Sequence, residues 1–353
     1  MQKTRGVLAV DVGGGTQDVL CWYEGQLLEN ALKMILPSPT VRVARELERL
    51  RQAGKDVVLV GRTMGGGPSG RAVRRHLEAG LKVYALPDPA RTLHDDLAKV
   101  QAMGVEIVDT PPPGATPVVL QDLESERLGK ALELFDLRLP EQIAVAVQDH
   151  GFSPHESNRL FRFRYWREFL TSGGDLKRLA TTPPPAYMTR MKAVCHTAPG
   201  ALVLDTGTAA ILGALLDPRG ARWNEDGLMV VNVGNFHTVA ALVRHYQVFA
   251  IYEHHTGQLT ADKLTRHLEA LKRKELTNQE IFDDNGHGCA YGDAALEGAF
   301  HRLLVTGPQR RRFFEDPSLF AAPFGDMMLS GSFGLLQAAA WAGGFSLDPE
   351  GVR

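Results

Sequence analysis

A chain of 353 residues is long for a single hydrophobic core, so its length predicts two domains. Its 44% hydrophobic and 23% charged residues are typical of an ordinary globular protein. A net charge of −2 gives no electrostatic basis for binding nucleic acid or an anionic membrane, and no apolar run reaches the roughly 20 residues of a membrane-spanning helix.

The cysteines and the first residues bear on the cellular compartment. Cys21, Cys195 and Cys289 are odd in number, far apart and outside any CxxC group. This usage argues for a reducing compartment and against a cysteine-ligated cluster. Because the chain enters a strand almost at once, with no signal-peptide core, we expect a cytoplasmic protein.

The first element in chain order is a pair of apolar runs joined by three glycines, VLAVDVGGGTQDVL at residues 7–20. Two strands with a tight glycine turn are the simplest interpretation. Glycine exposes backbone N–H groups that can surround an anion, and neighbouring carboxylates can hold a hydrated cation. The pattern therefore predicts a metal-bridged phosphate, bound by Asp11, Gly13, Gly14, Gly15, Thr16 and Asp18.

A second glycine-rich segment lies further along the chain. After a helix over Val41–Ala53, the strand Asp56–Val60 runs into GRTMGGGPSG at residues 61–70 and then a helix over Arg71–Ala79. A strand, a glycine loop and a helix present backbone amides to an anion. We expect Gly65, Gly66 and Gly67 to hold a phosphate or carboxylate of a second substrate. The alternative is a flexible connector, because the spacing matches neither the P-loop nor the dinucleotide fingerprint.

Polar residues follow the apolar strand Ile143–Val147, which ends in the sequence QDHG. A helix over Arg91–Met103 and a strand over Pro117–Leu120 precede it. The carboxyl end of a buried strand is well placed for catalysis in α/β proteins. We predict Asp149 and His150 as catalytic residues, with Asp149 as the proton acceptor. The alternative is a hydrogen-bonded turn.

The segment RLFRFRYWREFL at residues 159–170 alternates arginines with aromatic residues. We interpret it as an amphipathic helix whose long cations cover apolar surface. A nucleic-acid stacking strip has little support in a chain that is not basic.

The middle of the chain contains the expected domain boundary. Residues 201–218 read as a strand that ends at Asp205, followed by a helix of small residues from Thr208. The polar segment Asp217–Asp226 then follows as a linker. We therefore predict domains at residues 1–217 and 218–353.

The sequence Leu228–Leu242 repeats the opening pattern: Asn232 aligns with Asp11, and Gly234 with Gly13. A strand–glycine turn–strand unit that recurs about 220 residues later indicates a duplicated architecture. The residues predicted for this second loop are Asn232, Gly234, Asn235, Phe236, His237 and Thr238. Near the end of the chain, a strand over Asp326–Leu329 should lead into SGSFG and a final helix from Leu335.

Five histidines lie at predicted strand ends or in glycine-rich loops: His150, His237, His254, His255 and His287. Together they could ligate a transition metal, contact an anionic substrate, or form structural hydrogen bonds. No pair has the i, i+4 spacing of a helical zinc site, and His254 and His255 should point to opposite faces of a strand. Of these, we predict His254 and His255 as substrate contacts.

These motifs resemble those of the actin-like ATPase superfamily, which includes actin, heat-shock chaperones, and sugar and acetate kinases. DVGGGTQD resembles its first phosphate loop, Asn232–Thr238 its second, Thr208–Pro218 its connecting helix, and DMMLSGSFG its adenosine segment. Asn232 departs from the usual aspartate. A competing second phosphate loop is Ala201–Ala210, which contains Asp-Thr-Gly-Thr.

The resemblance implies an α/β fold of duplicated ribonuclease-H-like domains with a nucleotide cleft between them. It implies ATP and Mg²⁺ as cofactors, with Gly331 and Ser332 at the adenosine and Asp11 and Asp205 at the metal. Residues 148–151 are also similar to the Gln-x-His-Gly strand end of some carbohydrate kinases. Transfer of the phosphoryl group to a small molecule is the leading hypothesis. The alternatives are an ATPase that activates or regulates a partner protein, and a nucleotide-binding protein without turnover.

More closely, TMGGGP, QDHG, DTGTAA, NVGNFHT and EHHTG together resemble a prokaryotic family provisionally labelled as pyruvate formate-lyase activating enzymes. That label implies a radical enzyme with an iron–sulfur cluster. The sequence lacks the cysteine triplet that such a cluster requires.

Overall fold

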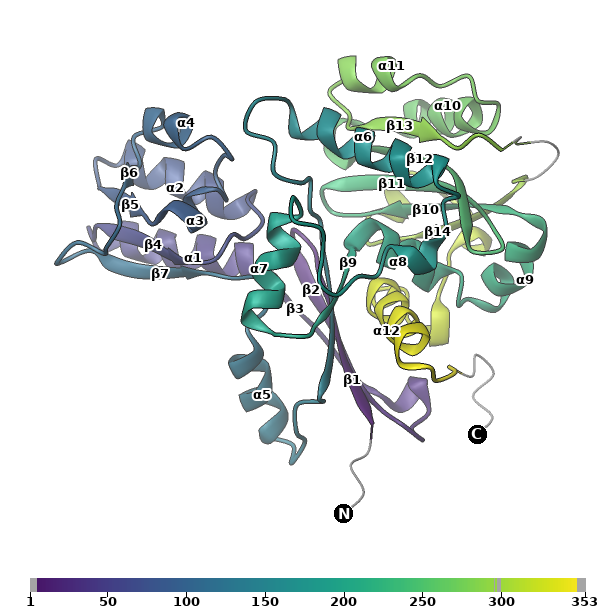
Figure 1. Cartoon of the computed structure of the whole chain (residues 1–353), viewed down its shortest axis with the longest axis horizontal. Coiled ribbons are helices and arrows are strands. Elements are labelled where there is room, and N and C mark those ends of the chain that lie inside the picture. Colours follow the sequence, from purple (N-terminus) through teal and green to yellow (C-terminus); the bar gives the residue numbers. More distant parts are fainter. Residues whose placement is uncertain (1–4, 295, 297–299, 348–353) are drawn as a thin grey trace.

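The computed structural model describes residues 5–294, 296 and 300–347, and it has a mixed α/β fold with three sheets (Figure 1). The predicted α/β class is therefore confirmed. Within the described ranges, no helix combines the length and apolarity needed to cross a bilayer.

The first sheet has the strand order β3-β2-β1-β8-β9. Its strands are β1 (Gly6–Val12), β2 (Thr16–Tyr23), β3 (Leu32–Pro37), β8 (Gln142–Val147) and β9 (Leu202–Asp205). The first three form an antiparallel meander, whereas β8 and β9 add in parallel to β1. β1 and β8 are buried apolar runs, as expected for central strands covered on both faces.

The second sheet has the order β13-β12-β11-β10-β14. Its strands are β10 (Leu228–Val233), β11 (His237–Arg244), β12 (Gln247–His255), β13 (Gly288–Tyr291) and β14 (Arg302–Thr306). Here too an antiparallel meander, β10–β12, precedes a strand that pairs in parallel with its first member. The two sheets thus share a three-strand antiparallel meander whose first strand pairs in parallel with a later strand, β8 in one sheet and β14 in the other. They differ beyond this unit, because β9 extends the first sheet next to β8, whereas β13 extends the second sheet next to β12.

A third, wholly parallel sheet lies between β3 and β8 in the sequence and has its own apolar core. Its strands are β4 (Val57–Gly61), β5 (Val83–Ala85), β6 (Glu106–Ile107) and β7 (Thr116–Leu120), and its helices are α1 (Pro39–Gln52), α2 (Pro68–Glu78), α3 (Pro87–Ala90) and α4 (Leu97–Ala102). Figure 1 shows this inserted unit at the left, beside the first sheet.

Two helices of small residues, α8 (Thr206–Ala214) and α12 (Ser330–Gly343), cross between the two larger sheets (Figure 1). A Cβ on Gly213 would lie 1.6 Å from the Ser330 carbonyl oxygen, and one on Gly334 would lie 2.0 Å from the Ala209 carbonyl oxygen. Glycine at both positions therefore lets the two backbones touch. This contact joins the two halves of the molecule, the one built on the first sheet and the one built on the second sheet, through one continuous core.

The other helices surround this arrangement. They are α5 (Ser125–Glu133), α6 (Asn158–Thr171), α7 (Thr189–Thr197), α9 (Pro218–Asp226), α10 (Ala261–Lys272) and α11 (Asn278–Asp283).

The structure corrects three local predictions. The expected linker Asp217–Asp226 is helix α9, because the Asp217 carboxylate caps it and Pro218 occupies its first turn. The segment Asp326–Leu329 forms a turn rather than a strand, and the last helix begins at Ser330. The helix expected over Arg91–Met103 is restricted to α4, which Asp96 caps. The domain ranges 1–217 and 218–353 stay predictions, and residues 1–4 and 348–353 lie outside the described residues.

Candidate active site

Two glycine turns with the same local geometry join β1 to β2 and β10 to β11. The Gly13 N–H donates to the Thr16 carbonyl at 2.9 Å, and the Gly234 N–H donates to the His237 carbonyl at 2.9 Å. A Cβ would lie 3.1 Å from the first of these oxygens and 2.7 Å from the second. Each turn therefore begins with glycine because a side chain would crowd the carbonyl that closes it.

The two turns face each other across the centre of the molecule. A Cβ on Gly14 would lie 2.0 Å from Cδ2 of Phe236, and one on Gly15 would lie 2.8 Å from Nδ2 of Asn235. The counterpart of the first turn is thus the β10–β11 turn. The competing segment around Asp205 belongs to α8 and to β9, which is a strand of the first sheet.

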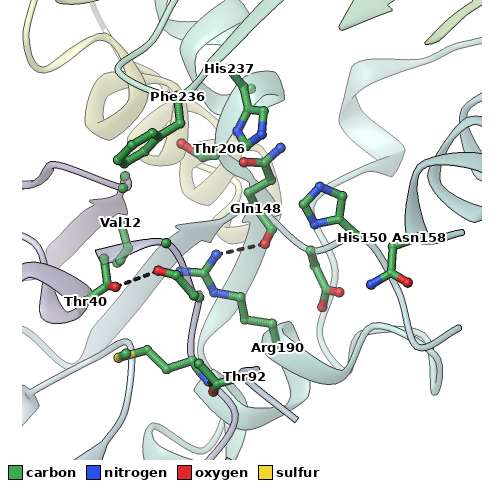
Figure 2. Close-up of a pocket in the computed structure, with 18 of the residues that line it drawn as sticks. Val12, Thr40, Thr92, Gln148, His150, Asn158, Arg190, Thr206, Phe236 and His237 are labelled. Atoms are coloured by element: carbon green, nitrogen blue, oxygen red, sulfur yellow. Dashed lines mark hydrogen bonds between the residues drawn. The ribbon is translucent and has the colours of Figure 1, made fainter. Parts of the chain in front are cut away.

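Two cavities meet at these turns. The larger, of about 440 Å³, extends from the turns to the inserted unit and to the residues after β8 (Figure 2). The smaller, of about 80 Å³, is lined by Asp11, Asp18, Gly331 and the segment Thr306–Pro308, among others. The residues that line both cavities are Gly13, Gly14, Thr206, Asn232, Gly234 and Asn235.

Asp11 and Asp18 form a carboxylate pair, directly opposite each other on β1 and β2. Burial, with a smaller contribution from the charge of Asp205, raises the pKa of Asp11 to about 7, although the Thr206 hydroxyl donates to it. Burial and the Asp11 charge raise the pKa of Asp18 to about 8. Oδ1 of Asp18 is buried without a hydrogen-bond partner among the described residues. Two facing carboxylates with an unsatisfied oxygen suit a hard cation such as Mg²⁺.

The predicted strand–glycine loop–helix unit is present, with β4 before the loop and α2 after it. Gly65, Gly66 and Gly67 line the larger cavity, and Gly67 takes a φ of 76° just before α2. The Thr40 hydroxyl fixes the loop by donating to the Gly66 carbonyl at 2.6 Å (Figure 2). The N-terminus of α2 and its fourth residue, Arg71, thus lie at the cavity wall.

Arg190, which sequence reasoning missed, joins the inserted unit to the first sheet. Its guanidinium binds both oxygens of Asp122 at 2.9 and 2.7 Å and donates to the Gln148 carbonyl at 2.9 Å (Figure 2). A Cβ on Gly65 would lie 2.6 Å from this guanidinium. Gly65 is therefore needed for close contact with Arg190. A bidentate pair of this kind positions the cavity wall rigidly.

Asp149 lines the larger cavity, but both of its carboxylate oxygens already accept backbone hydrogen bonds. Oδ1 accepts from the Gly151 N–H at 2.8 Å and Oδ2 from the Met191 N–H at 2.9 Å. Burial raises its pKa, which these bonds and Arg190 partly offset. The carboxylate therefore holds the turn together, and its role as a base stays a prediction.

Arg162 of α6 is a buried connection between the two halves and was also missed. Its Nε donates to Glu253 at 2.6 Å, and its Nη1 donates to Asp205 at 2.9 Å and to the Asp149 carbonyl at 2.9 Å. The predicted amphipathic helix is thus only partly correct, because this cation is 3% exposed and pairs with carboxylates. Asp205 also caps α8 by accepting from Gly207 and Thr208. With both oxygens engaged, it offers no support for the predicted metal role.

His150 and His237 line the larger cavity near Gln148 and belong to a cluster of histidines (Figure 2). One potential ligand atom from each of His150, His237, Glu253 and His287 lies within 4.8 Å of every other. The Nε2 atoms of His150 and His287 are 3.0 Å apart. Burial is the largest cause that lowers the pKa of all three imidazoles, to about 4 for His237, so they are neutral at physiological pH.

The strand alternation predicted for the adjacent histidines is present in β12. His255 lines the larger cavity beside His237, which is its cross-strand partner. His254 points to the opposite face, where its buried Nε2 lies 3.0 Å from Asp284. The position of His254 therefore gives no support to its predicted role as a substrate contact.

The other residues predicted to bind the nucleotide lie either at one of the two cavities or in the core. Thr16, Asp18 and Gly331 line the smaller cavity, whereas Phe236 and His237 line the larger. Thr238 is fully buried against Thr256, and the fully buried Ser332 donates its hydroxyl to the Asp18 carbonyl. Thr238 and Ser332 therefore stabilise the loops from the core and line neither cavity.

Comparison with protein-family models matches residues 64–312 to the family described as "Putative pyruvate format-lyase activating enzyme (DUF1786)". The chain belongs to this family. This membership confirms the family resemblance drawn from the motifs. No curated protein sequence matches the chain.

The chain is also similar to several solved structures. They include the ROK hexokinase of Thermus thermophilus (11% identity, TM-score 0.22, covering 69% of this chain and 47% of that one). Two others are the ethanolamine utilization protein EutJ of Carboxydothermus hydrogenoformans (11%, 0.28, 94% and 88%) and an exopolyphosphatase-like protein (10%, 0.22, 80% and 61%). The chain thus spans less than two thirds of the hexokinase and of the exopolyphosphatase-like protein.

Proposed function

We propose that this family member binds ATP with Mg²⁺ between its two glycine turns and transfers the terminal phosphoryl group to a small molecule in the larger cavity. The observation that carries the proposal is the apposition of the turns, with Gly14 against Phe236, at the junction of two cavities. The three-strand meander with a parallel neighbour to its first strand, present in both sheets, supports duplicated actin-like domains, at residues 1–217 and 218–353.

The turns would hold the phosphates through backbone amides. The N–H groups of Gly13 and Gly234 close their own turns. The amides proposed to bind the anion are therefore those between the closing bonds, Gly14 and Gly15 in one turn and Asn235 and Phe236 in the other. Asp11 and Asp18 would hold Mg²⁺, because their oxygens suit that ion and Oδ1 of Asp18 has no other partner among the described residues. When bound, Mg²⁺ supplies neutralisation of phosphate charge, which phosphoryl transfer needs more than covalent chemistry.

The larger cavity would hold an acceptor with an anionic group. Arg71, Arg91 and the N-terminus of α2 all lie at its wall. Helix N-termini and guanidinium groups both bind carboxylates and phosphates. Asp149, also in this wall, is the proposed acceptor of the hydroxyl proton, since burial raises its pKa towards values useful for proton transfer.

Calorimetry and an acceptor screen test the proposal in sequence. We expect ATP to bind with Mg²⁺ and to bind more weakly to the Asp11→Asn variant. Release of ADP should then rise with a hydroxylated small acid or sugar phosphate, and the acceptor should gain the phosphoryl group. Absence of binding at millimolar ATP would refute the nucleotide site. Stimulation only by a protein would favour a regulatory ATPase.

A further inference from the structure

The histidine cluster has the composition and spacing of a transition-metal site. In a tetrahedral zinc site with bonds of about 2.0–2.2 Å, two ligand atoms lie roughly 3.3–3.6 Å apart. The four atoms of His150, His237, Glu253 and His287 already lie within 4.8 Å of one another. Side-chain movements of about 1 Å would therefore place all four atoms around one ion.

Internal hydrogen bonding does not fully account for the cluster. His287 is 2% exposed, and its Nδ1 has no hydrogen-bond partner among the described residues. Its Nε2 faces the Nε2 of His150, and only one of these two neutral nitrogens can donate. A buried imidazole with one unpartnered nitrogen, next to two other imidazoles and a carboxylate, points to a ligand that accepts lone pairs.

The surrounding residues orient the donors. The Glu253 carboxylate accepts from Arg162 Nε and from Gln148 Nε2, both at 2.6 Å. Each carboxylate oxygen retains a second lone pair. Hydrogen bonds of this kind fix the orientation of metal ligands. Imidazole donors select a zinc-type ion over Mg²⁺, which prefers oxygen ligands.

We propose that His150, His237, Glu253 and His287 bind one divalent transition-metal ion of the Zn²⁺ class, separate from the proposed Mg²⁺ site. His150 follows β8 of the first sheet, whereas the other three ligands belong to the second sheet or to the segment that enters it. His237 also directly follows the turn that contains Phe236. The ion ties the two halves together and fixes the second glycine turn at the cavity.

The test uses tag-free full-length protein, stripped of metal by a chelator and supplied with Zn²⁺ or with Co²⁺ as a spectroscopic probe. We expect one ion per chain after gel filtration, with visible absorption from bound Co²⁺. The His150→Gln and His287→Gln variants should bind at least tenfold more weakly. The His155→Gln variant, which changes an exposed histidine in the same loop, should bind as the wild type does.

Thermal unfolding provides the second measurement. Zn²⁺ should raise the unfolding midpoint of the wild type and His155→Gln but not that of His150→Gln, because only the bridging ion stabilises the contact between halves. If His287→Gln fails to fold, the less deeply buried His150 still decides the question. Failure of the wild type to retain Zn²⁺, or retention unchanged in His150→Gln, would overturn the proposal. Neither measurement requires nucleotide, so the result is independent of the ATP site.

Discussion

Replacing Asp18 with asparagine should remove much of the loss of stability that we expect for the wild type between pH 6 and pH 8. In the native state the pKa of Asp18 is raised from its ordinary value of 3.8 to about 8, by burial and by Asp11. The native state thus keeps a proton that the unfolded state has already released. The stabilisation that this proton provides is fully present below about pH 4, decreases as the pH rises, and is lost above about pH 8.

The size of the effect follows from proton linkage. At pH 6 the native state holds about one proton more on Asp18 than the unfolded state does, and at pH 8 it holds about half a proton more. Between these two pH values, the free energy of unfolding of the wild type should therefore fall by about 2 kcal/mol relative to that of Asp18→Asn. The comparison with the variant is needed because the buried histidines, whose pKa values are lowered, add a dependence of opposite sign near pH 6.

Urea unfolding at pH 6, 7 and 8 measures the difference between wild type and variant. Asp109→Asn, which changes an exposed aspartate, should follow the wild type. Saturating Mg²⁺ with ATP should flatten the wild-type dependence, since a bound cation keeps the carboxylates ionised. Parallel pH profiles for the wild type and Asp18→Asn would refute the interpretation of the carboxylate pair.

Three other variants test separate parts of the site. Gly14→Ala should weaken ATP binding about tenfold, or ~1.4 kcal/mol, by pushing Phe236 away, and adding Phe236→Ala should recover part of the loss in calorimetry. Arg162→Met leaves two buried carboxylates without their cation and should lower the free energy of unfolding in urea by roughly 3–5 kcal/mol. Arg164→Met, which changes an exposed arginine, should alter it by less than ~1 kcal/mol. Equal effects of the two variants would contradict the buried network. Arg71→Ala should raise KM for an anionic acceptor about tenfold and leave KM for ATP unchanged; an unchanged acceptor KM would exclude this contact.

The sequence predicted the two glycine turns because each turn is determined by residues that are close together along the chain. Apolar runs fix β1, β2, β10 and β11, and a side chain at Gly13 or Gly234 would crowd the carbonyl closing its own turn. The glycine loop before α2 was predictable from the strand, glycine run and proline that mark it, but the contact of Gly65 with Arg190 was not. The start of α12 was not, because its buried Ser330 and Gly331 are helical through packing on α8 and β1 rather than through local preference.

The roles of charged residues depended on their partners. Arg162 lies in a run of alternating arginines and aromatic residues that reads as a surface helix, yet it meets Glu253 and Asp205 from distant strands. Asp205 resembled a metal ligand in sequence, but a helix cap and Arg162 engage both of its oxygens. Such assignments require the positions of residues that are far apart along the chain.

The sequence by itself determined the two similar turns and the strand alternation that separates His254 from His255, since both follow from backbone geometry over a few residues. Only the tertiary structure decided that Gly14 meets Phe236, and that His150 joins His237, Glu253 and His287. The physical reason is that these contacts cross between two sheets whose relative placement is set by the close packing of α8 and α12, which no local pattern encodes.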